Sequence, residues 1–138
     1  MHLDETRGQV ERLERVFESM DLRARGKHCA GMAGILEEGS DLLEEDGEKA
    51  VLDAAFIAAA QRVEHYEITA YGSLMAWAKV LGLGEAISLL KENEQEEKAA
   101  DAKLSQLAEA GINQAAAAGQ EETEEAEEAE ETASGRRK

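Results

Sequence analysis

Two carboxylates stand where a helix of a water-soluble protein usually carries apolar side chains. In the stretch "QRVEHYEITAYGSLMAWAKVLG", residues 61–82, Glu64 and Glu67 share one face with Tyr71 and Met75 when successive residues turn by about 100°. Burying an unpaired carboxylate is costly because the charged form loses its hydration, so the group takes up a proton or binds a cation. We therefore expect the two carboxylates on this face to be protonated or to bind a cation, and not only to pack in a core.

Acids interrupt the apolar stripe of two other helical stretches in the same way. Between residues 83 and 108, steps of three or four residues join Leu83, Ala86, Leu90, Glu94, Glu97, Asp101, Leu104 and Ala108. Near the start of the chain, the line of Leu13, Val16 and Met20 continues back through Gln9 and Glu5, with His2 one turn earlier. Three helices thus aim oxygen ligands inward, as bundles that hold a pair of iron or manganese ions do.

Simpler interpretations of these acids remain open. The inward carboxylates could pair with Arg12, Arg62 or Lys98, or a rotation of a long helix could bring them to solvent. His2 has a spacing to Glu5 that suits a ligand pair, but it also sits at a terminus that could fray. His65 points about 100° away from Glu64 and is predicted to lie on the surface or at an interface.

The elements that position these residues are predicted to be helices throughout. The 138 residues contain no proline, 43% hydrophobic side chains and only 4% aromatic ones, a composition that favours an all-α protein. The pattern predicts helices over residues 2–20, 29–45, 49–81 and 85–110, with the second short and bent by its glycines and the last closed by Gly111. Short turns between them predict an antiparallel bundle.

The distribution of charge divides the chain into two parts. The net charge is −16, and residues 121–131 alone hold eight glutamates. We expect residues 1–111 to form one helical domain and residues 112–138 to be a low-complexity acidic tail that stays disordered, because it lacks large apolar residues. An acidic surface repels phosphate groups, so we expect neither nucleic acid nor membrane as a partner.

The single cysteine, Cys29, excludes a disulfide within the chain and any Cys-based metal cluster. We expect it to be a small buried hydrophobe. With no apolar segment long enough for a signal peptide or a membrane span, the sequence predicts a cytoplasmic, soluble protein.

Four stretches of the chain resemble the YciE/YciF family of ferritin-like bacterial stress proteins: "HLDETRGQVERLERVFE", "GKHCAGMAGILEEG", "DAAFIAAAQRVEHYEITAYGSL" and "EEKAADAKLSQLA". The resemblance covers residues 2 to about 108. It implies a ferritin-like bundle, dimerisation and a dinuclear metal site. The ligands that it implies, by position, are Glu5, Glu64, Glu67, Glu97 and Asp101. It also implies that the chain lacks the family's first helix and one of its ligands, which Glu94 could replace.

Three functions follow from these observations. The first is a ferritin-like, stress-associated protein that binds iron or manganese between helices, with oxygen or peroxide chemistry at the metal. The second is a non-catalytic helical scaffold that has lost the metal site. A peroxide-consuming enzyme resembling manganese catalase is a third, and it needs a complete dinuclear site. Because a shortened bundle exposes apolar surface, we expect a homodimer or higher homo-oligomer.

Overall fold

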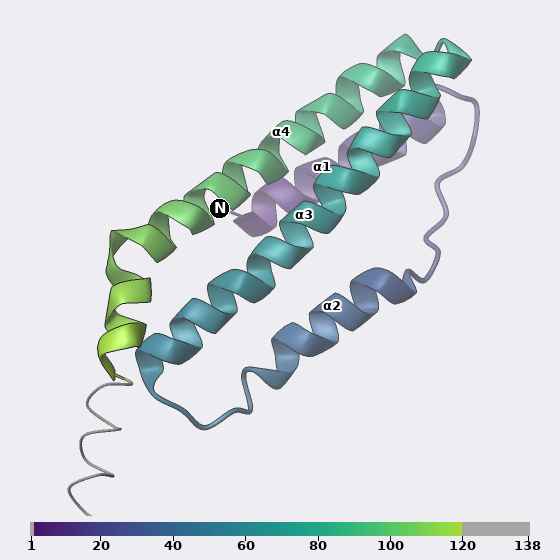
Figure 1. The fold of residues 1–138 in the computed structure, drawn as a ribbon. Helices are drawn as coiled ribbons and strands as arrows, with labels where there is room; N and C mark the ends of the chain where they lie inside the picture. Colours follow the sequence, from purple (N-terminus) through teal and green to yellow (C-terminus); the bar gives the residue numbers. More distant parts are fainter. Residues whose placement is uncertain (1, 120–138) are drawn as a thin grey trace, which may run out of the picture.

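The computed structural model of the chain describes residues 2–119, and its regular structure over that range is entirely helical (Figure 1). The elements are α1 (His2–Glu18), α2 (Ala30–Asp41), α3 (Lys49–Leu81), α4 (Gly84–Leu107) and a π-helical turn, η1 (Ala108–Ile112). The predicted all-α class is confirmed. The third predicted helix, 49–81, has the bounds of α3.

A tight turn at Gly82 joins α3 and α4 into an antiparallel hairpin. Gly82 adopts φ 72°, a left-handed conformation that favours glycine, and its N–H donates to the carbonyl groups of Ala78 and Lys79. The N–H of Leu83 closes the cap by donating to the Ala78 carbonyl oxygen at 2.9 Å. This cap fixes the relative position of the two helices that carry most of the inward acids.

The hairpin is the centre of the fold, and the other two helices pack on its two sides. Helix α1 packs on α4, and α2 packs on α3 beside its N-terminal half (Figure 1). The buried apolar core lies where α1, α3 and α4 meet near the Gly82 turn. It consists of Val16, Tyr71, Ala78, Ala86, Leu89 and Leu90. Toward the other end of the hairpin, buried polar groups replace these apolar side chains.

Three local predictions were wrong. Helical structure does not stop at Gly111, since residues 113–119 are again helical beyond η1. Gly111, at φ 142°, allows a kink there, and the following alanines favour helix. The second helix ends at Asp41 rather than near residue 45. Cys29 is exposed: its Sγ accepts from the N–H of Met32 and so caps α2.

Residues 120–138 lie outside the described range, and so does most of the predicted acidic tail. The division of the chain at residue 111 therefore stays a prediction. Within residues 2–119, no helix combines the length and the apolar character that crossing a bilayer requires.

Candidate metal centre

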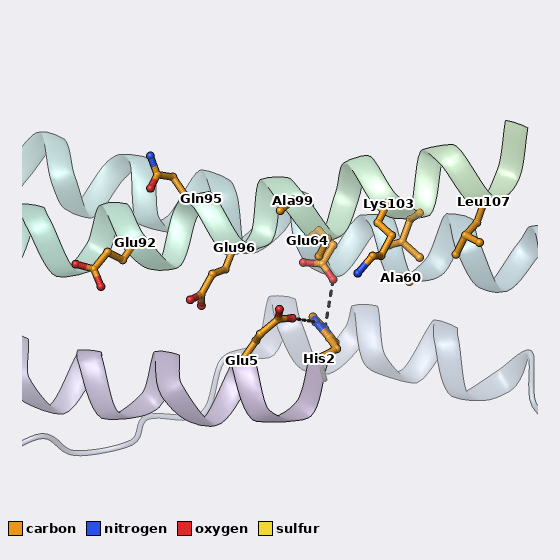
Figure 2. A pocket seen from close by; sticks show the side chains of 12 residues that line it. His2, Glu5, Ala60, Glu64, Glu92, Gln95, Glu96, Ala99, Lys103 and Leu107 are labelled. Carbon is orange, nitrogen blue, oxygen red and sulfur yellow. Dashed lines mark ion pairs between the residues drawn. The ribbon is translucent and has the colours of Figure 1, made fainter. Parts of the chain in front are cut away.

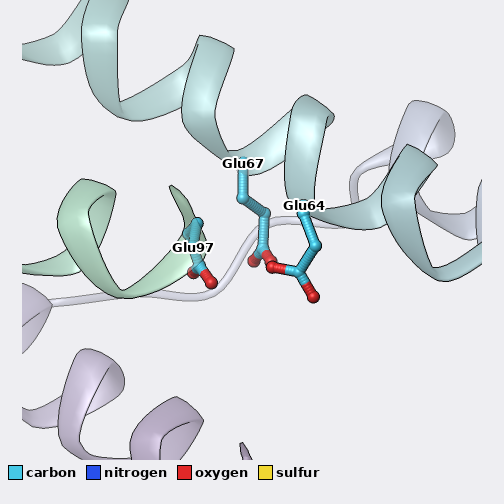
Figure 3. Close-up of side chains that lie close together, drawn as sticks. All are labelled: Glu64, Glu67 and Glu97. Atoms are coloured by element: carbon cyan, nitrogen blue, oxygen red, sulfur yellow. The ribbon is translucent and has the colours of Figure 1, made fainter. Parts of the chain in front are cut away.

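Three glutamates from α3 and α4 converge inside the bundle (Figure 3). Glu64 and Glu67 come from successive turns of α3, and Glu97 comes from α4. One carboxylate oxygen of each lies within 4.8 Å of the other two. Glu64 and Glu97 are only 3% and 1% exposed, and Glu67 is partly buried. We call these three residues the carboxylate triad.

The triad holds oxygen atoms that lack a partner. Glu64 Oε2 and Glu97 Oε1 are buried and accept no hydrogen bond within the described part of the chain. A buried acceptor left in this state costs about 1–3 kcal/mol, and more when it is charged. The site is therefore incomplete without a proton or a cation.

The basic side chains that could have neutralised the triad are engaged elsewhere. Arg12 pairs with Glu96 and lies 3.5 Å from Glu92, Arg62 lies 3.9 Å from Glu38, and Lys98 lies 2.9 Å from Glu94. The interpretation that these cations pair with the inward acids thus holds for Glu94, which pairs with Lys98, but Arg12, Arg62 and Lys98 form no ion pair with the triad within the described residues. One contact from a basic side chain does reach the triad: His2 Nε2 lies 3.5 Å from Glu64 Oε1. It is an ion pair only when His2 is protonated.

The electrostatics of the triad favour binding of positive charge. Burial raises the pKa of Glu64 and of Glu67 above the ordinary value for a glutamate. Burial, followed by the neighbouring Glu64 carboxyl, raises the pKa of Glu97 to about 7. A carboxyl that holds its proton near neutral pH releases it when a divalent ion supplies the compensating charge instead.

The other two expected ligands lie next to the triad rather than in it. The exposed carboxylate of Glu5 places Oε2 at 3.7 Å from His2 Nδ1. Asp101 accepts a hydrogen bond from Gln61 at 2.9 Å, and its Oδ1 lies 3.1 Å from His65 Nε2. Glu94, the suggested replacement ligand, is held by Lys98. The structure thus brings together three of the five expected residues.

A cavity of about 530 Å³ opens beside the triad, between the start of α1 and the C-terminal half of α4 (Figure 2). Glu64 is part of its wall, where His2 and Glu5 approach from α1. The remaining lining includes Ala60, Ala99, Leu104 and Lys103. Of the triad, the cavity touches Glu64 and neither Glu67 nor Glu97.

Asn93 is a site residue that the sequence analysis missed. It is fully buried, and its amide donates to the Tyr71 hydroxyl at 3.2 Å and to the Gln9 carbonyl at 3.3 Å. Its own oxygen accepts from Arg12 at 3.1 Å. The available signal was spacing, because Asn93 lies four residues before Glu97. It positions α1 and α3 against α4 one turn from the triad.

The donor set determines which ions would fit. Three carboxylates offer only hard oxygen atoms, which suit manganese, ferrous iron and magnesium better than soft thiophilic metals. The three groups come from two helices fixed by the Gly82 cap, so they are positioned in advance of binding. Unpartnered, buried and anionic oxygens of this kind fit a divalent cation.

A helical bundle with inward carboxylates is the class of protein that this fold and site define. The chain belongs to the family described as "Domain of unknown function (DUF892)", which matches residues 1–117. It is 47% identical over 116 residues to Protein YciF of Escherichia coli (strain K12), covering 83% of this chain and 70% of that protein.

Solved structures agree with the family assignment. The crystal structure of the E. coli stress protein YciF matches with a TM-score of 0.77 and 48% identity, over 81% of this chain and 71% of that one. The structure of YcfI from Rhodopseudomonas palustris matches with a TM-score of 0.73 and 45% identity, over 75% and 66% of the two chains. The resemblance drawn from the four sequence stretches is thereby confirmed, as is the four-helix bundle.

Proposed function

We propose that the protein binds a divalent iron or manganese ion through Glu64, Glu67 and Glu97 and acts in a stress response. The observation that carries the metal proposal is the pair of buried, unpartnered oxygens, Glu64 Oε2 and Glu97 Oε1, in a triad that no Lys or Arg of the described chain neutralises. The stress association is supported by the likeness to YciF, which is a stress protein of E. coli. The cytoplasm is the compartment we propose.

When bound, a redox-active ion of this kind supplies one-electron chemistry with oxygen or peroxide. The residues of this chain would contribute binding and access. The triad would hold the ion, and the cavity bordered by His2 and Glu64 would admit a small oxidant from solvent. Asn93 would keep the two helices that bear the ligands in register.

Thermal unfolding with and without metal tests the binding proposal. Manganese added to metal-free protein should raise the melting temperature, because a ligand that binds only the folded state stabilises it. Glu97→Gln keeps the shape of the side chain but removes a negative oxygen, so it should abolish most of that rise. Glu109→Gln, on the exposed surface of η1, is the matched control and should respond like the original protein.

The scaffold alternative predicts a different response to metal. If the triad is only a remnant, Glu67→Leu stabilises the fold equally in the presence and absence of metal, since it removes a carboxyl that burial disfavours. Under the metal proposal, Glu67→Leu stabilises the metal-free protein but loses the rise that manganese produces. Equal melting curves with and without metal, for every variant, would contradict the proposal.

A further inference from the structure

Four polar side chains outside the triad meet at the surface of the α3–α4 hairpin. Gln61 and His65 lie one turn apart on α3, and Asp101 and Ser105 lie one turn apart on α4. Gln61 Nε2 donates to Asp101 Oδ1 and to Ser105 Oγ, each at 2.9 Å. His65 Nε2 lies 3.1 Å from the same Asp101 Oδ1. We call these four residues the His65 site.

The antiparallel course of the two helices brings these residues together. A step of four residues forward along α3 is matched by a step of four back along α4, so His65 faces Asp101 and Gln61 faces Ser105. The Gly82 cap fixes this alignment of the two helices. The His65 site is therefore set by the hairpin itself, and no residue of α1 or α2 belongs to it.

The separation of His65 and Asp101 suits two ligands of one metal ion. Zinc binds a histidine nitrogen at about 2.0–2.1 Å and a carboxylate oxygen at about 2.0–2.2 Å, so two such ligands of a tetrahedral ion lie about 3.3–3.5 Å apart. The observed distance between Nε2 and Oδ1 is 3.1 Å. A small rotation of the exposed imidazole supplies the difference.

Gln61 can add a third ligand. Its amide carries an oxygen and an NH2 group on one planar unit, and half a turn exchanges the two. After that turn, the amide oxygen would occupy the place from which Nε2 now contacts Asp101 and Ser105. A set of one imidazole nitrogen, one carboxylate oxygen and one amide oxygen suits a borderline ion such as zinc, whereas the triad offers carboxylates alone.

The His65 site is open to solvent, and the carboxylate in it is available to a cation. The side chain of His65 is 68% exposed, and that of Asp101 is 24% exposed. Beside them is a surface hollow of about 420 Å³, lined by Ala58, Gln61, Arg62 and His65. Arg62 lies 3.9 Å from Glu38, and within residues 2–119 no Lys or Arg forms an ion pair with Asp101.

We propose that His65 and Asp101, together with Gln61, form a second metal site that binds zinc or a similar borderline divalent ion at the surface of the hairpin. The site shares no residue with the triad and does not depend on the ion proposed there. It gives Asp101, which lies on the inward stripe of α4 but outside the triad, a ligand role of its own.

Zinc binding by a Glu97→Gln chain tests the proposal, because that substitution weakens the triad as a competing site. The affinity of the full-length, metal-free variant is measured by competition with a chromophoric chelator, and we expect one zinc ion per chain. Adding His65→Gln should weaken binding by about tenfold or more, since the loss of even an outer-shell group costs about 10–100-fold. Adding His28→Gln, at an exposed histidine before α2, is the matched control and should leave the affinity unchanged.

A second ligand variant and a spectroscopic readout complete the test. Asp101→Asn, in the same Glu97→Gln chain, should weaken zinc binding as His65→Gln does. In proton NMR, zinc should shift the imidazole signals of one of the three histidines, and those signals should be missing from the His65→Gln chain. Circular dichroism would confirm that each variant folds.

Two results would overturn the proposal. The first is an equal zinc affinity in the His65→Gln and His28→Gln chains, which places the ion elsewhere. The second is a folded Glu97→Gln chain that binds no zinc, which leaves His65 and Asp101 as a simple contact between helices.

Manganese keeps this outcome distinct from that of the triad. With Glu97 intact, His65→Gln should retain as much manganese as the original protein, because the triad has all its ligands. A loss of manganese in that variant would overturn the separation of the two sites.

Discussion

At the scale of single residues, the triad joins three carboxyls that differ in how completely they are buried. Glu97 is the extreme case, since it is 1% exposed and its neighbour across the site is another nearly buried carboxyl, Glu64. Repulsion and desolvation act in the same direction there, so the metal-free protein keeps a proton in the site near neutral pH. That proton gives the site a measurable signature without any metal.

The stability of the metal-free protein should fall as pH rises. The pKa of Glu97 is raised to about 7 in the folded protein, above its ordinary value of 4.5, so the folded state binds the proton more tightly than the unfolded state does. This contribution is fully present below the ordinary pKa and is lost as pH rises through about 7. Urea unfolding of metal-free protein between about pH 5 and pH 8 should show it.

Glu97→Gln should flatten this pH profile, because an amide cannot titrate. Glu109→Gln, in an exposed position, should leave the profile unchanged. A profile that is the same in the original protein and in Glu97→Gln would mean that Glu97 does not carry the proton.

The helical periodicity of the sequence predicted that the three triad residues point inward, but it did not predict that Glu5 and Asp101 lie outside the triad. Glu64, Glu67 and Glu97 were found because a stripe of apolar residues on each helix continues through them. Asp101 is on the same stripe, yet it bonds to Gln61 and His65. Which partner a carboxylate binds depends on how α3 and α4 are aligned with each other. The periodicity of a single helix does not predict that alignment.

At the scale of elements, α1 is held on the hairpin largely by polar contacts near the triad. Asn93 on α4 joins the Tyr71 hydroxyl of α3 to the Gln9 carbonyl of α1, and Arg12 of α1 pairs with Glu96 of α4. Leu13 and Val16 add apolar packing further along α1. The buried amide of Asn93 is thus one of several contacts that set the position of α1, and with it the wall of the cavity beside Glu64.

Asn93→Leu should lower the free energy of unfolding by roughly 2–4 kcal/mol. The leucine leaves the Gln9 carbonyl and the Tyr71 hydroxyl without their buried partner, and groups stranded in this way account for large losses of stability. Urea denaturation measures the loss. Gln95→Leu, an exposed position two residues later on α4, should change stability by less than about 0.5 kcal/mol. Equal losses in the two variants would show that the Asn93 network contributes little.

The turn between α3 and α4 gives a second test at this scale. Gly82→Ala should destabilise the protein by about 1 kcal/mol, because alanine is disfavoured at φ 72°. Gly84→Ala should be neutral or slightly stabilising, since Gly84 begins α4 without a positive φ and a Cβ there meets open space. The pair can be compared by thermal unfolding, and a larger loss at Gly84 would contradict this description of the cap.

Most element bounds could be predicted because glycines and acids mark the ends of the helices. Residues 49–81 form a helix between the "DGEK" turn and "GLG", as expected. The kink at Gly111 could not be predicted, because glycine is equally able to end a helix and to bend one. The alanines that follow Gly111 favour helix, so the helix continues beyond the bend instead of ending there.

At the scale of the whole molecule, the acidic side chains fall into two groups. Most of those in the described part of the chain are exposed, and the full sequence carries a net charge of −16. The triad instead gathers three carboxylates inside the bundle, between α3 and α4. A substitution on the exposed surface away from the triad, such as Trp77→Glu at a residue that is 63% exposed, should therefore leave metal binding as in the original protein.

The metal content of the purified chain tests the central claim most directly. Metal-free protein is reconstituted with manganese or ferrous iron without oxygen, desalted, and analysed for metal per chain, alongside Glu97→Gln and Glu109→Gln. We predict at least one ion per chain for the original protein and for Glu109→Gln, and a large loss for Glu97→Gln. Folded protein that retains no metal, or retains the same amount in all three, would contradict a metal site at Glu64, Glu67 and Glu97.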